Sequence, residues 1–186
     1  MQLSARHASL IQRGCGFMRD DRTKWDRLSS DIAVELARGT TLRRVNGLQL
    51  TMISGPSVLS SFDVFDVSLV GWPEVASEDR YAVTMRRDRV LLVGACDLED
   101  GWHADRNLAV SDISHGYAVF ELSSEATIGL LKQGTEIDLD RPSKSVVRLA
   151  FGLGLHIYRY GNESTFRIHV LSHQSEALIG FLKSTK

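Results

Sequence analysis

Alternating apolar and polar residues predict short β-strands along most of this chain. Between Tyr117 and Leu122, the side chains of Ala118, Phe120 and Leu122 share one face, as the two-residue period of a strand requires. The pattern favours a protein built mainly of strands. In four other segments, the apolar residues that share a face are Leu48, Leu50 and Met52; Val147, Leu149 and Phe151; Leu153, Leu155 and Ile157; and Phe166, Ile168 and Val170.

A helical period occurs in three places. Apolar residues three or four positions apart predict one helix over Lys24–Arg38 and another over Ser124–Leu131. Gly134 lies where a helix commonly ends in a left-handed residue. A third helix is predicted from Ser172 onward. Its apolar stripe comprises Ala177, Leu178, Phe181 and Leu182.

Turn signals separate these elements. The stretches Tyr81–Met85 and Val90–Val93 flank the charged residues Arg86–Arg89, which predicts a hairpin with a four-residue loop. Clustered arginines of this kind are typical of a solvated hairpin tip. The apolar segment Val58–Val67 predicts a brief helix and loop, and the polar segment Ala95–Asn107 is interpreted as the connection between two lobes.

The succession of a strand, a short helix and further strands occurs twice, which suggests a duplication, although unrelated α+β proteins can show the same succession. The predicted fold class is α+β, with two βαββ-type lobes whose sheets are mixed or antiparallel, plus an N-terminal helix. We assign residues 1–47 to an N-terminal arm and helix, and residues 48–186 to a two-lobed domain. Lobe 1 spans about 48–94 and lobe 2 about 109–186.

Composition excludes several classes of protein. The net charge is −1, from 22 basic and 23 acidic residues, so no general attraction to nucleic acid or to an anionic membrane is expected. The longest apolar runs, such as Val90–Gly94, are too short to span a bilayer. The two cysteines, Cys15 and Cys96, show no CxxC spacing, and no secretory leader is present, so a cytoplasmic location is expected.

The motifs of common active sites are missing from the sequence. No CxxC, HExxH or HxH motif is present, and a break between strand and helix separates His169 from His173. Neither cysteine lies in a nucleophile motif. The glycines of Gly152-Leu153-Gly154 lie between two strands and do not open a helix, as a phosphate site would require. We therefore predict no catalytic residue, no metal ligand and no FAD, NAD or ATP bound by this chain.

One turn contains candidate binding residues. The segment Ser111–Gly116, with the sequence SDISHG, precedes a predicted strand. Asp112 could accept a proton and His115 could donate a hydrogen bond, so Asp112, Ser114 and His115 are weak candidates for cofactor binding. The alternative, which we favour, is that the short polar groups bond the backbone of their own turn.

This turn and the segments after it resemble the second lobe of the gamma subunit of heterotetrameric sarcosine oxidase. That family is related to the folate-binding aminomethyltransferases of the glycine cleavage system, which carry a similar DVSH turn before such a strand. The resemblance extends to Lys132-Gln133-Gly134 and Asp138-Leu139-Asp140 and, in the first lobe, to Arg80–Gly94. It covers roughly Leu48–Lys183.

The resemblance implies a non-catalytic gamma subunit that supports a large alpha subunit. Such a complex demethylates sarcosine, or a related N-methyl amine, oxidatively and passes the one-carbon unit to tetrahydrofolate. FAD, FMN, NAD, tetrahydrofolate and zinc are expected in other subunits, and the expected partners are the alpha, beta and delta subunits. In isolation, the chain is expected to expose an apolar patch and to form homodimers.

Two alternatives remain open. The chain could be a stand-alone folate-binding or aminomethyltransferase-like protein, or a regulatory protein with the same fold and no metabolic role. Its length is roughly half of what a transferase with three subdomains needs, so we do not expect the chain to enclose a folate cavity alone.

Overall fold

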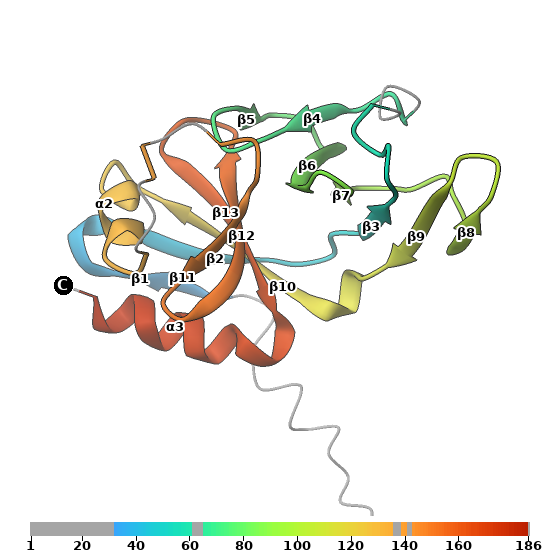
Figure 1. The fold of residues 1–186 in the computed structure, drawn as a ribbon. Helices are drawn as coiled ribbons and strands as arrows, with labels where there is room; N and C mark the ends of the chain where they lie inside the picture. Colours follow the sequence, from blue (N-terminus) through green and yellow to red (C-terminus); the bar gives the residue numbers. More distant parts are fainter. Residues whose placement is uncertain (1–31, 61–64, 136–138, 141–142, 186) are drawn as a thin grey trace, which may run out of the picture. The chain divides into compact units, whose positions relative to one another are not determined.

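A computed structural model describes residues 32–60, 65–135, 139–140 and 143–185, which belong to a unit that runs from Asp31 to Lys186. Two β-sheets make up most of the described part (Figure 1). The first half contributes β1 (Ala33–Glu35), β2 (Thr41–Val45), β3 (Leu50–Ser54), β4 (Ser68–Val70), β5 (Val75–Ala76), β6 (Tyr81–Arg86) and β7 (Arg89–Val93). The second half contributes β8 (Gly101–His103), β9 (Leu108–Asp112), β10 (Tyr117–Ser123), β11 (Val147–Ala150), β12 (Leu153–Tyr160) and β13 (Thr165–Leu171). The helices are η2 (Ala37–Gly39), η4 (Ser114–Gly116), α2 (Thr127–Lys132), η5 (Ser172–Gln174) and α3 (Ser175–Ser184).

The strands divide between a large and a small sheet. The large sheet has the order β1-β2-β10-β13-β12-β11, and β5 pairs with β12 in parallel. The small sheet has the order β4-β6-β7-β3-β9-β8, and its pairs are antiparallel except for β4 with β6. The chain crosses from the large sheet to the small sheet between β2 and β3 and returns between β9 and β10, and in between only β5 pairs with the large sheet.

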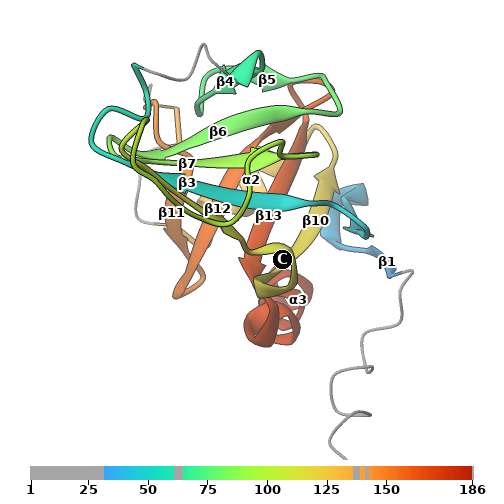
Figure 2. The same cartoon turned by 90° about the vertical axis from the view of Figure 1, so that its right-hand side faces the viewer.

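The two sheets face each other across an apolar core. Tyr81, Val83 and Leu91 of the small sheet belong to the same buried cluster as Val119 and Tyr158 of the large sheet. Figure 2 shows β6, β7 and β3 crossing over β12 and β13. Burial of these side chains between the sheets is the main favourable contribution to their association.

The opposite faces of the sheets are also covered. Helix α3 packs on β13 of the large sheet, and its Leu178 and Leu182 are fully buried. The residues of β13 buried on that face are Phe166, Ile168 and Val170. The outer face of the small sheet has its own buried cluster, formed by Ile53, Val58, Phe65, Ala82, Val90, Leu92 and Leu108.

The predicted fold class is confirmed, because the described part is an α+β structure with two mixed sheets. The strand predicted at Tyr117–Leu122 is β10, and the helix predicted from Ser172 is η5 followed by α3. The predicted hairpin is also present, but its turn is tighter than expected because Arg86 pairs with Arg89. The helix predicted over Ser124–Leu131 begins later, at Thr127 of α2.

The helix predicted over Lys24–Arg38 lies mostly outside the described residues, and its last part is wrong. Ala33–Glu35 form strand β1, which pairs antiparallel with β2, and Arg38 adopts a left-handed φ of 61° in η2. Pairing with a neighbouring strand outweighs the helical spacing of the apolar residues. Since β2 also pairs with β10, the segment before residue 48 contributes strands to the large sheet.

Two segments expected to connect elements contribute to the small sheet. The segment Ala95–Asn107 contains β8, which pairs with β9, so the small sheet extends to Asp112. In the segment Val58–Val67, residues 58–60 form a turn and none of the described residues lies in an α-helix, although Val58 is fully buried under the sheet.

Val147 and Leu149 share a face of β11 as predicted, but this apolar face is the exposed one. Val147 and Leu149 are exposed, whereas Arg148 and Ala150 between and after them are buried. The guanidinium of Arg148 lies 5.0 Å from the centroid of the Trp72 ring. This cation–π contact lets a long charged side chain occupy a buried position that the apolar pattern assigned to its neighbours.

Gly134 follows α2 as predicted. Its backbone, however, is not left-handed, because Gly134 does not belong to the described glycines that have a positive φ. A Cβ at this position would lie 2.2 Å from the ring of Phe151. The backbone N–H of Phe151 also donates to the oxygen of Gly134 at 2.5 Å. Glycine is therefore required here by the close approach of an aromatic ring.

We expect Gly134→Ala to lower the free energy of unfolding by about 1–3 kcal/mol, because the added methyl group must displace the ring of Phe151. Gly180 of α3 is the matched control, because a Cβ there would meet no atom within 4 Å. Gly180→Ala is expected to raise the free energy of unfolding by about 0.5–1 kcal/mol. Urea unfolding followed by circular dichroism measures both, and changes of the same sign would contradict this account.

Candidate functional site

The predicted candidate turn lies at the crossing from the small sheet to the large sheet. The carboxylate of Asp112 accepts hydrogen bonds from the backbone N–H of Ser114 at 2.8 Å and from its hydroxyl at 2.5 Å. The hydroxyl oxygen of Ser114 in turn accepts from the N–H of Leu50 at 3.0 Å. Two candidate residues thus bond each other and the start of β3.

These bonds decide what Asp112 can do chemically. Hydrogen bonds from Ser114 lower the pKa of Asp112, because they stabilise the ionised carboxylate. A carboxylate with a lowered pKa is a weak base at neutral pH. The third candidate, His115, has an exposed side chain, and its backbone oxygen accepts from the Ser172 hydroxyl at 3.0 Å. The turn is therefore arranged to join the sheets to the C-terminal helix.

Two surface depressions flank Ser114. One has a volume of ≈ 190 Å³ and includes Cys96, Asp100 and Asp112, and the other has a volume of ≈ 180 Å³ and includes Tyr117. A third depression, beside Trp72 and Arg159, measures ≈ 250 Å³. Ligand pockets usually measure about 300–1,000 Å³. None of these three depressions reaches that size.

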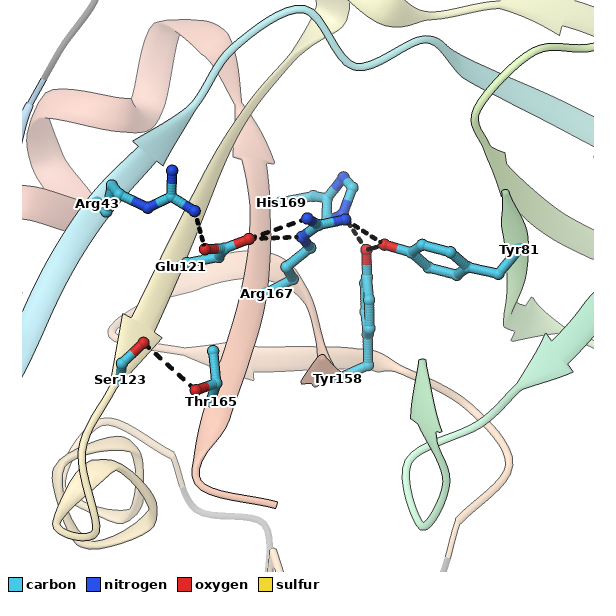
Figure 3. Close-up of polar contacts among 8 residues, drawn as sticks. All are labelled: Arg43, Tyr81, Glu121, Ser123, Tyr158, Thr165, Arg167 and His169. Carbon is cyan, nitrogen blue, oxygen red and sulfur yellow. Dashed lines mark hydrogen bonds and ion pairs between the residues drawn. The ribbon is translucent and has the colours of Figure 1, made fainter. Parts of the chain in front are cut away.

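A buried polar network between the sheets was missed by the sequence analysis (Figure 3). Arg167 of β13 donates to the hydroxyl oxygen of Tyr81 of β6 at 2.8 Å. The Nε and Nη2 atoms of Arg167 donate to Oε1 of Glu121 of β10 at 3.0 Å and 2.9 Å. The other oxygen of Glu121 pairs with Arg43 of β2. The network therefore links three strands of the large sheet to β6 of the small sheet.

The network continues through two tyrosines to a histidine. The hydroxyl groups of Tyr81 and Tyr158 are 2.7 Å apart, and the Tyr158 hydroxyl lies 2.7 Å from Nε2 of His169. Arginine can only donate, so the Tyr81 oxygen accepts from Arg167. The Tyr81 O–H group finds its acceptor in the hydroxyl oxygen of Tyr158. Tyr158 then donates to Nε2 of His169, which requires a neutral imidazole with its proton on Nδ1.

Burial agrees with this direction of donation. Burial raises the pKa of Tyr81 and that of Tyr158, so both phenols keep their protons. Burial also lowers the pKa of His169 well below its ordinary value, so the ring is neutral at neutral pH. The fixed protonation states suit a network that holds two sheets together.

A sequence signal for this network does exist. In β12 and β13 the residues that alternate with the apolar face include Tyr158, Arg167 and His169, all of which can make hydrogen bonds. In register, Arg167 also pairs with Glu121 of β10. A row of complementary polar side chains across three strands indicates a second covered face.

Other candidates can now be placed. In the described part of the chain, no group of three or more His, Cys, Asp or Glu residues could hold a metal ion. Cys96 is a half-buried free thiol, and Cys15 lies outside the described residues. None of the helices described here is long and apolar enough to cross a membrane.

No family model matches this chain, and no curated protein matches it either. A chain in the solved structure of heterotetrameric sarcosine oxidase from Corynebacterium sp. U-96, in complex with pyrrole 2-carboxylate, matches with a TM-score of 0.61. The two chains share one fold. Their sequences are 17% identical, and the match covers 83% of this chain and 86% of that chain.

A second solved structure is more distant. The glycine cleavage system aminomethyltransferase T from Bartonella henselae matches with a TM-score of 0.44 and 13% identity. The match covers 75% of this chain and 44% of that protein. This likeness is too distant to support an argument about fold or function.

Proposed function

We propose that this chain is a gamma-type, non-catalytic subunit of a heterotetrameric sarcosine oxidase-like complex. The observation that carries the proposal is the fold likeness, which spans most of both chains and therefore relates two polypeptides of similar length. Most of this chain then corresponds to one small chain of the oxidase. Alpha, beta and delta subunits are the proposed partners, and they would hold the FAD, FMN, NAD, tetrahydrofolate and zinc.

The geometry of the candidate turn supports a structural role. Asp112 and Ser114 form hydrogen bonds with each other, and Ser114 also bonds the start of β3. The buried network fixes one sheet against the other. Such a rigid two-sheet unit suits a subunit that supports a larger partner. The reaction proposed for the complex is the oxidative demethylation of sarcosine or a related N-methyl amine.

Purification through a tag on this chain, expressed in its native host, tests the proposal. We expect larger subunits to be recovered with the chain, together with flavin absorbance and sarcosine-dependent formation of hydrogen peroxide. The chain produced alone is expected to show neither flavin absorbance nor oxidase activity. Stoichiometric flavin on the lone chain would contradict the proposal, and so would recovery of the tagged chain without partners.

A titration distinguishes the proposed subunit from the alternative, a stand-alone folate-binding protein. The lone chain is titrated with tetrahydrofolate while its tryptophan fluorescence is recorded. A subunit of the proposed kind gives no saturable signal in the micromolar range, whereas a stand-alone folate-binding protein does.

A further inference from the structure

An exposed apolar surface lies on β11 and β12. Leu149 is 63% exposed and Val147 is 37% exposed. Cross-strand pairing places Leu149 opposite Gly154 and Val147 opposite His156, so each pair shares one face of the sheet. Gly154 is exposed, and a Cβ there would meet no atom within 4 Å, so the surface above β12 is open at this point.

The tip of the β6–β7 hairpin borders this apolar surface. Directly before β11, the N–H of Val146 donates to the oxygen of Thr84 in β6 at 2.9 Å. This bond holds the start of β11 beside the end of β6, where the charged segment Arg86–Arg89 begins. The hairpin tip contains three arginines and one aspartate, so the border is basic.

Tyr117 completes the surface, and Arg89 of the hairpin tip lies near it. The ring of Tyr117 lies against His156, with 5.1 Å between the centroids. Burial raises the pKa of Tyr117, and the charge of Arg89 partly offsets that rise, so the guanidinium lies near the phenol. Arg89 is half-buried, and its buried Nε donates to no acceptor in the described part of the chain. That Nε atom is out of a partner's reach, but Arg86 and Arg87 at the hairpin tip are exposed, so a partner's carboxylates can pair with their guanidinium groups.

We propose that the surface formed by Val147, Leu149, Gly154, Tyr117, Arg86 and Arg89 binds an acidic and apolar segment of a larger subunit. An apolar side chain of that segment lies over Gly154, between Leu149 and Tyr117. Its carboxylates pair with the arginines of the hairpin tip. The inference rests on the proposed function, and it adds which surface of this chain meets the partner and what chemistry the partner presents.

A second exposed aromatic surface is less suited to this role. Trp102 of β8 is 61% exposed and has acidic neighbours. Those carboxylates are already engaged, because Asp97 and Asp105 pair with arginines and Asp100 accepts from the N–H of Asp112. The carboxylates of this surface are therefore engaged within the chain itself, whereas the surface around Leu149 is bordered by the exposed Arg86 and Arg87.

Two variants of the tagged complex test the inference. Leu149→Asp and Trp102→Asp place the same carboxylate at positions of nearly equal exposure, 63% and 61%. We expect Leu149→Asp to reduce recovery of the larger subunits by about tenfold or more, as for an interface hot spot, and Trp102→Asp to leave recovery within about twofold. Circular dichroism of the two lone chains checks that both remain folded.

Modification of arginines in the wild-type protein supplies a readout that needs no variant. Phenylglyoxal is applied to the lone chain and to the complex, and the modified residues are found by mass spectrometry. Arg86 and Arg89 are expected to be protected in the complex, whereas the exposed Arg106 on the β8–β9 hairpin reacts in both. Equal reactivity of Arg86 and Arg89 in the two samples would overturn the inference, as would loss of partners in Trp102→Asp alone. If the wild-type chain recovers no larger subunit, the proposed function itself fails, and the inference fails with it.

Discussion

Replacing Tyr81 by phenylalanine is expected to lower the free energy of unfolding by about 2–4 kcal/mol. The change removes one oxygen atom from a fully buried side chain. Arg167 then loses the acceptor of its Nη1 group, and Tyr158 loses the hydroxyl group that lies 2.7 Å from its own. A buried charged donor without an acceptor costs more than a neutral one, which sets the size of the effect.

Tyr160 provides the matched control. Its ring lies 3.3 Å from the Arg167 guanidinium and 5.9 Å from the Tyr81 ring between centroids, so it belongs to the same cluster. Its hydroxyl group, however, forms no hydrogen bond within the described residues, so Tyr160→Phe is expected to change stability by less than about 0.5 kcal/mol. Urea unfolding of both variants at neutral pH measures the difference. Similar losses in both would show that the hydroxyl network contributes little to stability.

Strands were predicted well from the sequence where the alternation of apolar and polar residues alone decides which side chains are buried. In β10 and β13, apolar residues such as Phe120 and Ile168 alternate along the strand and are fully buried, as the period of two requires. The same rule could not reveal that the alternating polar residues Arg167 and His169 are buried too. That burial depends on a second sheet, whose position is not encoded in the local pattern.

Two errors have the same kind of cause. The strand β1 has helical spacing of its apolar residues, and only its pairing with β2 makes it a strand. On β11, the cation–π contact of Arg148 with Trp72 decides which face is buried. In both cases a contact between segments outweighs the local preference, as expected when tertiary interactions compete with weak propensities.

The two candidate sites differ in how far apart their residues lie in the sequence. Asp112 bonds Ser114 two positions away, and such short-range bonds of turn residues can be anticipated from residue type. In the buried network, Arg167 is 46 positions from Glu121 and 86 positions from Tyr81. The alternating polar residues of β12 and β13 indicate a second covered face, but they do not say which residues pair across it. Register across the sheet has to be known first.

Acid is expected to destabilise the protein between about pH 6.5 and 4. Burial lowers the pKa of His156 from its ordinary value to about 4. In the unfolded chain, this histidine binds a proton near pH 6.5. Between these two values the unfolded state binds more protons, so the free energy of unfolding falls as the pH falls, in total by about 3 kcal/mol from this residue. The loss ends below about pH 4, where both states are protonated.

Protonation of His169 is also expected to lower the free energy of unfolding, because the pKa of this buried histidine is lowered too. It does so by disturbing the hydrogen bonds between the two sheets. A protonated His169 donates from Nε2, so Tyr158 must accept from it and turns its own O–H toward Tyr81 instead. Arg167 cannot accept, so Tyr81 then accepts from both Arg167 and Tyr158, and its own O–H group is left without an acceptor.

The variant His156→Phe measures the contribution of His156 to this pH dependence separately from that of His169. It keeps an aromatic ring against Tyr117 and removes the titrating group. Urea unfolding measured at several pH values between 4 and 6.5 is expected to show a slope smaller than that of the wild-type protein by up to about 1.4 kcal/mol per pH unit. An unchanged slope would mean that His156 is protonated in the folded protein as readily as in the unfolded chain, which is incompatible with a ring that is buried beside Tyr117.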